Sequence, residues 1–146
     1  MQLQSSPIAL LAASTLLLCA PLGACGGGAD AGGGAAAVNI EKGVKLTDKG
    51  MAALNSGDPK GALESLEKAL TQLEAGSPEY MRAKAGEIEA LIQVDAARAK
   101  SQLLALGPAA DENLYAKIGN KLCTAGKLAE ATDVLDAGIK LYSESP

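Results

Sequence analysis

Four residues of this chain recur at an interval of 69 positions, and this recurrence constrains the fold more than any other feature. The pairs are Gly50 and Gly119, Gly57 and Gly126, Ala62 and Ala131, and Leu66 and Leu135. An interval of 69 is twice about 34, which is a common length for a unit of two helices and a turn. A middle copy with Ala90, Ala99 and Leu103 keeps the steps of nine and four residues that separate Ala53, Ala62 and Leu66, and its glycine is Gly86. Such units bury their apolar faces by stacking, so the recurrence predicts about three stacked units.

The region from residue 40 to residue 146 has the composition of an all-α protein. It is rich in Ala, Leu, Glu and Lys, its apolar residues recur at helical spacing, and Gly, Asp or Pro separate the segments. Its 107 positions match about three units. Because Ala99 lies 37 residues after Ala62 and 32 before Ala131, we expect the turns of the middle copy to differ in length.

The last copy carries the fullest repeat pattern. It consists of Tyr115-x2-Ile118-Gly119-x2-Leu122, then Gly126, then Ala131-x3-Leu135. This pattern resembles the tetratricopeptide (TPR) repeat, and the resemblance implies a short TPR-like array of about three helix-turn-helix repeats. Small residues at the glycine and alanine positions would let the two helices of a repeat approach closely. A plain helical bundle is the alternative, since alanine is common throughout this chain.

The N-terminus has the pattern of an export signal. Ile8 to Ala20 is an apolar run of 13 residues, shorter than the roughly 18 to 20 residues of a membrane-spanning helix. The sequence Leu22-Gly23-Ala24-Cys25 follows and resembles the bacterial lipobox. The resemblance implies a signal peptide over residues 1–24 and lipidation of Cys25, which becomes the first residue of the mature chain. Gly26 in place of Asp implies export to the outer membrane, facing the periplasm.

Two alternatives to the lipoprotein signal remain open. The segment before Ile8 contains no Lys or Arg, although signal sequences usually begin with a basic region. The chain could therefore carry an ordinary secretory signal or an uncleaved anchor helix. After Cys25 the chain is rich in Gly and Ala up to residue 39, which predicts a flexible linker spanning on the order of 20 Å.

Composition excludes several classes of function. The chain has no His, the usual neutral-pH general base and commonest metal ligand. Its cysteines, Cys19, Cys25 and Cys123, lack the spacing of a zinc site. We therefore expect no catalysis, no metal and no cofactor. The net charge of −4 also argues against a nucleic-acid partner. Cys123 is predicted to be a small buried residue, and Glu64, Glu67 and Glu74 to lie on a solvated face.

The resemblance to TPR proteins also implies a binding surface. In such arrays the first helix of each unit lines a concave face that binds peptides. Here that face would carry Lys84, Ile88, Leu91, Asn113, Ala116, Lys117, Asn120 and Thr124. Lys84, Lys117 and Asn120 resemble part of the Lys/Asn clamp that some TPR proteins use for a peptide carboxylate, although the full clamp is absent. General groove lining or simple solvation of these side chains are the alternatives.

The C-terminal helix, predicted from Leu128 to Tyr142, has an apolar flank. Its inward stripe is predicted to contain Leu128, Ala131, Leu135, Ile139 and Tyr142. Val134 and Leu141 lie roughly 100° to 120° to one side, and only four residues follow Tyr142. We expect these two residues to contact a partner or a second copy of the chain. The alternative is two aliphatic side chains exposed to solvent.

The sequence therefore predicts a lipid-anchored, protein-binding scaffold of the bacterial cell envelope. Its expected partners are the membrane, through Cys25, and a protein or peptide of unknown identity. The domain order is a signal peptide (1–24), the lipidated cysteine with its linker (25–39) and the helical repeat domain (40–146). The alternative function is a periplasmic small-ligand carrier, or an accessory subunit of an enzyme, built on a plain helical bundle.

Overall fold

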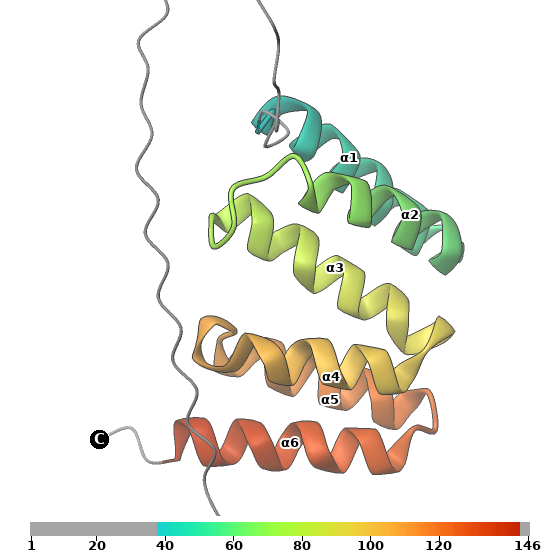
Figure 1. Ribbon diagram of the computed structural model, residues 1–146. Coiled ribbons are helices and arrows are strands. Elements are labelled where there is room, and N and C mark those ends of the chain that lie inside the picture. The colour runs from blue at the N-terminus through green and yellow to red at the C-terminus, as the bar shows by residue number, and fades with distance from the viewer. Residues whose placement is uncertain (1–37, 144–146) are drawn as a thin grey trace, which may run out of the picture. The chain divides into compact units, whose positions relative to one another are not determined.

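The computed structural model describes residues 38–143, and every regular element within them is helical (Figure 1). The elements are α1 (Ile40–Asn55), α2 (Pro59–Leu70), α3 (Pro78–Val94), α4 (Ala96–Leu106), the 3-10 turn η1 (Gly107–Ala109), α5 (Glu112–Thr124) and α6 (Leu128–Tyr142). The predicted all-α class is thus confirmed for this part of the chain. The predicted signal peptide, Cys25 and the linker up to residue 37 lie outside the described residues.

The helices form three successive pairs, α1 with α2, α3 with α4 and α5 with α6. They follow one another through the described part, with α1 near one end and α6 at the other (Figure 1). The pairs are joined because α3 packs on α2, and because the first helices contact one another in the order α1, α3, α5. The second helices α4 and α6 are also in contact.

Side-chain caps explain where most helices begin. Asn39, Asp58, Ser77, Asp95 and Asp111 each accept a hydrogen bond from a backbone N–H of the first turn. Such caps satisfy backbone donors that have no partner inside the helix. Five of the six α-helices therefore carry a start signal in their own sequence, whereas α6, which follows Lys127, has no side-chain cap.

The first and last pairs share the same turn geometry. Gly57 and Gly126 adopt positive φ angles of 81° and 74°, a conformation that glycine adopts without steric cost. The N–H of Asp58 donates to the carbonyl of Ala53, and the N–H of Lys127 donates to that of Leu122, both at 2.9 Å. Residues 69 positions apart therefore occupy equivalent places in these two turns. In the middle pair Asp95 alone separates α3 from α4, so the turn lengths differ as expected.

The glycines on the first helices provide close helix contacts. A Cβ atom at Gly50 would lie 2.5 Å from the side chain of Leu66, and one at Gly119 would lie 2.5 Å from that of Leu135. Close approach within the pair is therefore confirmed at these two positions. Gly86 differs, because its nearest neighbours are Met51, at 2.8 Å, and Leu66 of the preceding pair. The expectation for the middle glycine is wrong, since this residue packs between pairs.

Substitution of Ala131 tests this packing. Ala131 is 1% exposed, so Ala131→Leu should lower the free energy of unfolding by about 1 to 3 kcal/mol through overpacking. Ala129→Leu is the control, because Ala129 is exposed on the same helix. Thermal unfolding followed by circular dichroism measures both effects. Equal destabilisation by the two substitutions would contradict the observed rotation of α6.

The rotation of α6 differs from the sequence prediction. Val134, expected on an outer flank, is fully buried (0% exposed). The reason is that α6 packs against α4 as well as α5, so Val134 shares a core cluster with Ala99 and Leu103. Val134 therefore cannot contact a partner, and this prediction is wrong. Leu141 stays partly exposed, whereas Ile139, expected to face inward, is 63% exposed.

Cys123 is also placed differently, since its side chain is exposed. The buried residues of α5 are Tyr115, Ile118, Gly119 and Leu122. Successive residues of an α-helix are about 100° apart, so Cys123 is turned away from the face that Leu122 presents to the core. The prediction of a buried thiol is wrong for this reason.

Candidate binding groove

The first helices of the three pairs line two hollows on the protein surface. The larger, of about 370 Å³, is lined by Met51, Leu54, Asn55, Glu89, Ile92, Gln93, Lys121, Thr124 and Ala125. The other, of about 360 Å³, is lined by Met81, Ala85, Ala109, Asp111, Asn113, Leu114 and Lys117. We call these two hollows together the α1/α3/α5 groove. Both linings mix apolar and polar residues, and five of the nine residues that line the larger hollow are polar or charged.

An ion cluster connects the two hollows. Glu89 of α3 is only 8% exposed and pairs with both Lys117 and Lys121 of α5, the latter at 2.6 Å. Burial raises the pKa of the Glu89 carboxyl, but hydrogen bonds and charge attraction from the two lysines outweigh burial and hold this pKa below its usual value. The cluster therefore joins α3 to α5 and neutralises part of the lysine charge within the groove.

Acid should weaken this cluster. A carboxyl whose pKa is lower in the folded chain stabilises the fold above its unfolded pKa, and this contribution is lost as the pH falls through the folded pKa. We expect Glu89→Gln to lower the free energy of unfolding at about pH 7, and the difference from wild type to shrink progressively below about pH 4.5. Urea unfolding across this range measures it. A difference that is independent of pH would contradict the assignment, and Glu74→Gln, at an exposed position, is the control.

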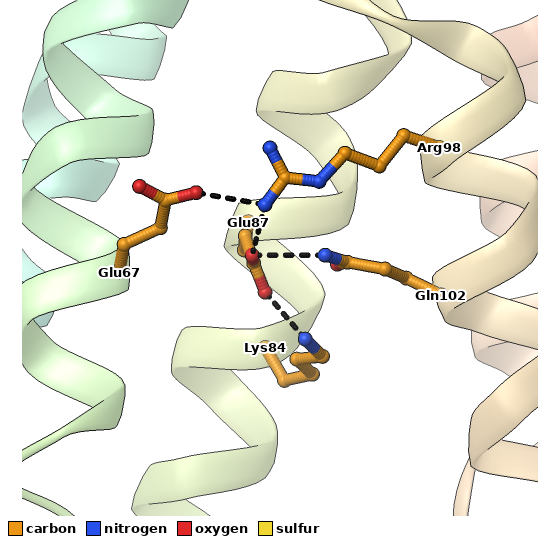
Figure 2. Close-up of polar contacts among 5 residues, drawn as sticks. All are labelled: Glu67, Lys84, Glu87, Arg98 and Gln102. Carbon is orange, nitrogen blue, oxygen red and sulfur yellow. Dashed lines mark hydrogen bonds and ion pairs between the residues drawn. The ribbon is translucent and has the colours of Figure 1, made fainter.

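A second ion cluster surrounds Glu87 on another side of α3 (Figure 2). Glu87 is 3% exposed and binds Lys84 at 2.6 Å, while the side-chain amide of Gln102 donates to it at 3.1 Å. Arg98 of α4 lies 3.9 Å from Glu87 and donates to Glu67 of α2 at 2.9 Å. The cluster thus connects α2, α3 and α4. It explains how the Glu87 carboxylate is held in the protein interior, since a buried charge needs partners.

The sequence-predicted binding residues have different positions. Lys117 lines the groove and pairs with Glu89, whereas Lys84 is bound to Glu87 and lines neither hollow. Asn120 is exposed on α5 but lines neither hollow. The three are therefore not gathered around one carboxylate-sized site.

The remaining predicted groove residues divide into three groups. Ala116 lines a different hollow, between α5 and α6, so its assignment to the groove is wrong. Asn113 and Thr124 line the groove as expected. Ile88 and Leu91 are completely buried in the core, so their assignment to the groove is wrong. Ile88 follows Glu87 by one residue, and Leu91 follows Glu89 by two. Each is therefore turned away from the charged side chain before it and toward the neighbouring helices. Sequence analysis missed Met51, Ile92 and Gln93 because nothing local separates a groove residue from a core residue on these helices.

Three further findings bear on function. Within residues 38–143, His, Cys, Asp and Glu side chains form no cluster that could hold a metal ion. No helix of the described part is both long and apolar enough to cross a membrane. Comparison with protein families, curated proteins and solved structures finds no match to the chain.

Proposed function

We propose that this chain is a bacterial lipoprotein, anchored in the membrane through Cys25, that binds a protein or peptide partner in the α1/α3/α5 groove. The observation that carries the proposal is the groove itself, since three helices from three different pairs combine to form it. We propose no enzymatic activity and no cofactor. The proposed anchor rests on the Leu22-Gly23-Ala24-Cys25 pattern, and Gly26 in place of Asp supports an outer-membrane location that faces the periplasm.

A TPR-like arrangement of the helices is part of this proposal. Its support is the agreement between the first and last pairs, which share a glycine turn and a glycine–leucine contact at an interval of 69 residues. The contacts of α1 with α3 and of α3 with α5 add support, because they bring the first helices to one face. The middle pair, with its one-residue turn, departs from this regularity.

The groove favours apolar side chains over a free carboxylate. Lys117 and Lys121 already bind the Glu89 carboxylate, so an external carboxylate would have to compete with an internal one. The hollows on either side are lined by Met51, Ile92 and other apolar groups. This chain contains no Phe or Trp, and a partner could supply such bulky side chains to fill them.

Partner capture with a blocked groove tests the proposal. Thr124 lines the larger hollow and is exposed, so Thr124→Trp should fill that hollow without disturbing the core. We expect this variant to lose at least tenfold in partner recovery from solubilised membranes, because the hollow can no longer accept a side chain. Ser101→Trp, at an exposed position on α4 outside the groove, is the control. Equal recovery by both variants would reject the groove as the binding surface.

A further inference from the structure

The end of the array formed by α5 and α6 has an exposed apolar surface. Leu128 and Ile139 are 64% and 63% exposed. Beside Ile139 is a hollow of about 240 Å³, which is also lined by Leu135 and Tyr142. We call Leu128, Leu135, Ile139 and Tyr142 the terminal apolar edge. Within residues 38–143, no helix covers this edge.

The first helix pair indicates what kind of structure fits this edge. By the 69-residue interval, Leu135 corresponds to Leu66 and Tyr142 to Leu73. Leu66 and Leu73 are buried in one cluster with Ala83 and Ala90 of α3. The equivalent position beside α6 is where a following helix would lie. The contact between α2 and α3 is therefore an example, within this chain, of the contact that the terminal apolar edge lacks.

The covering helix has a distinct chemistry. On α3 the contact with the first pair is made by Ala83, Gly86 and Ala90, which share one helix face because their spacing is i, i+3, i+7. A Cβ atom at Gly86 would lie 3.3 Å from the Leu66 side chain. The contact thus pairs small residues of the covering helix with large residues of the covered one.

An ion pair accompanies the same contact. Arg98, on the helix that follows α3, donates to Glu67 of α2 at 2.9 Å. The residue that corresponds to Glu67 on α6 is Asp136, which is exposed and makes no ion pair within the described part of the chain. A basic residue on the second helix of a docked hairpin would meet Asp136 as Arg98 meets Glu67.

Within residues 38–143, a second copy of this chain offers no free hairpin of this kind. Its α3 is already packed on its own α2. The small residues of α1 are also occupied, since Gly43 and Gly50 lie against Leu73 and Leu66 of α2. These packed helices therefore favour another protein as the partner.

We propose that the terminal apolar edge docks a helical hairpin of a partner protein. The first helix of this hairpin has Ala or Gly at positions i, i+3 and i+7, and its second helix carries an Arg or Lys that pairs with Asp136. This surface lies apart from the α1/α3/α5 groove, and the proposal does not depend on what that groove binds.

A peptide copy of residues 77–110, which contains α3 and α4, is a suitable probe. Fluorescently labelled peptide is titrated into the purified full-length protein, and binding is followed by anisotropy. We expect saturable binding that Ile139→Asp weakens about tenfold or more, since it places a charge in the apolar contact. Leu141→Asp, a partly exposed leucine on another side of the same helix, should change the affinity less than about twofold.

A charge exchange tests the ion pair. Asp136→Lys should weaken peptide binding about fivefold, and a peptide with Arg98→Glu should restore it with this variant. Absence of saturable binding up to about 1 mM peptide, or binding that Ile139→Asp leaves unchanged, would overturn the proposal. Self-association of the protein without peptide, abolished by Ile139→Asp, would also overturn it, because a second copy would then be the occupant.

Discussion

Cys25→Ala should abolish incorporation of a fatty-acid analogue and block normal maturation of the chain. Each buried methylene of an acyl chain contributes about 0.8 kcal/mol to membrane binding, so two or more chains hold a protein on the bilayer almost permanently. No other cysteine follows the pattern of Leu22-Gly23-Ala24-Cys25. The measurement combines metabolic labelling of the expressed full-length chain with fractionation of membranes.

Cys19→Ala is the matched control for this result. Cys19 lies within the apolar run, six residues before Cys25, and its loss should leave labelling intact. Labelling that persists in Cys25→Ala would rule out the lipid anchor at this position. If the wild type takes up no label and both variants leave the membrane fraction, the result would instead indicate an ordinary secretory signal.

The largest effect on stability is expected from Lys84→Met. This change leaves the Glu87 carboxylate, which is 3% exposed, without its closest cationic partner. Removing one member of a buried ion pair costs about 3 kcal/mol or more, and for a domain of this size the melting temperature should fall by about 10 to 20 °C. Differential scanning calorimetry measures the change. Lys45→Met is the control, since the Lys45–Glu41 pair is exposed and should contribute little.

A double substitution shows whether the loss arises from the pair. Glu87→Gln removes the charge that Lys84→Met leaves unpaired, so the two changes together should destabilise the fold less than Lys84→Met alone. Additive losses would mean that Lys84 acts through packing of its aliphatic chain and not through its charge.

The helical class and the matching of the first and last pairs were predictable because their signals are local or repeated. Gly57 and Gly126 mark turns, and Gly50 and Gly119 mark close contacts, through properties that glycine alone has. These residues act in the same way in both pairs. Glu64 and Glu74 are exposed as predicted, because charged residues on a helix follow its solvated side.

The rotation of individual helices was not predictable to the same degree. The sequence prediction for the inward face of α6 assumed one neighbouring helix. In the structure α6 has two neighbouring helices, α4 and α5. The second contact turns Val134 into the core and leaves Ile139 outside. Packing between elements far apart in sequence decides such rotations, and a single helix pattern does not contain that information.

The charged residues of α3 and α5 illustrate the same limit. Lys84 and Glu87 are three positions apart on one helix, a spacing that allows ion pairs, so their pairing had a sequence signal. Glu89 and Lys121 are 32 residues apart, and their contact depends on how α3 and α5 lie together. The sequence therefore indicated that Lys117 lies in the groove, but it did not indicate that the Glu89 carboxylate pairs with Lys117.

Site-specific photo-crosslinking tests the central claim most directly. A photoreactive amino acid is placed at Gln93, within the larger hollow of the α1/α3/α5 groove, in the full-length protein in its native membrane. The same residue at Ser101 on α4 is the control. The account predicts a cross-link to one partner protein from position 93, absent from position 101 and lost with Thr124→Trp. No adduct from position 93, or the same adducts from both positions, would contradict it.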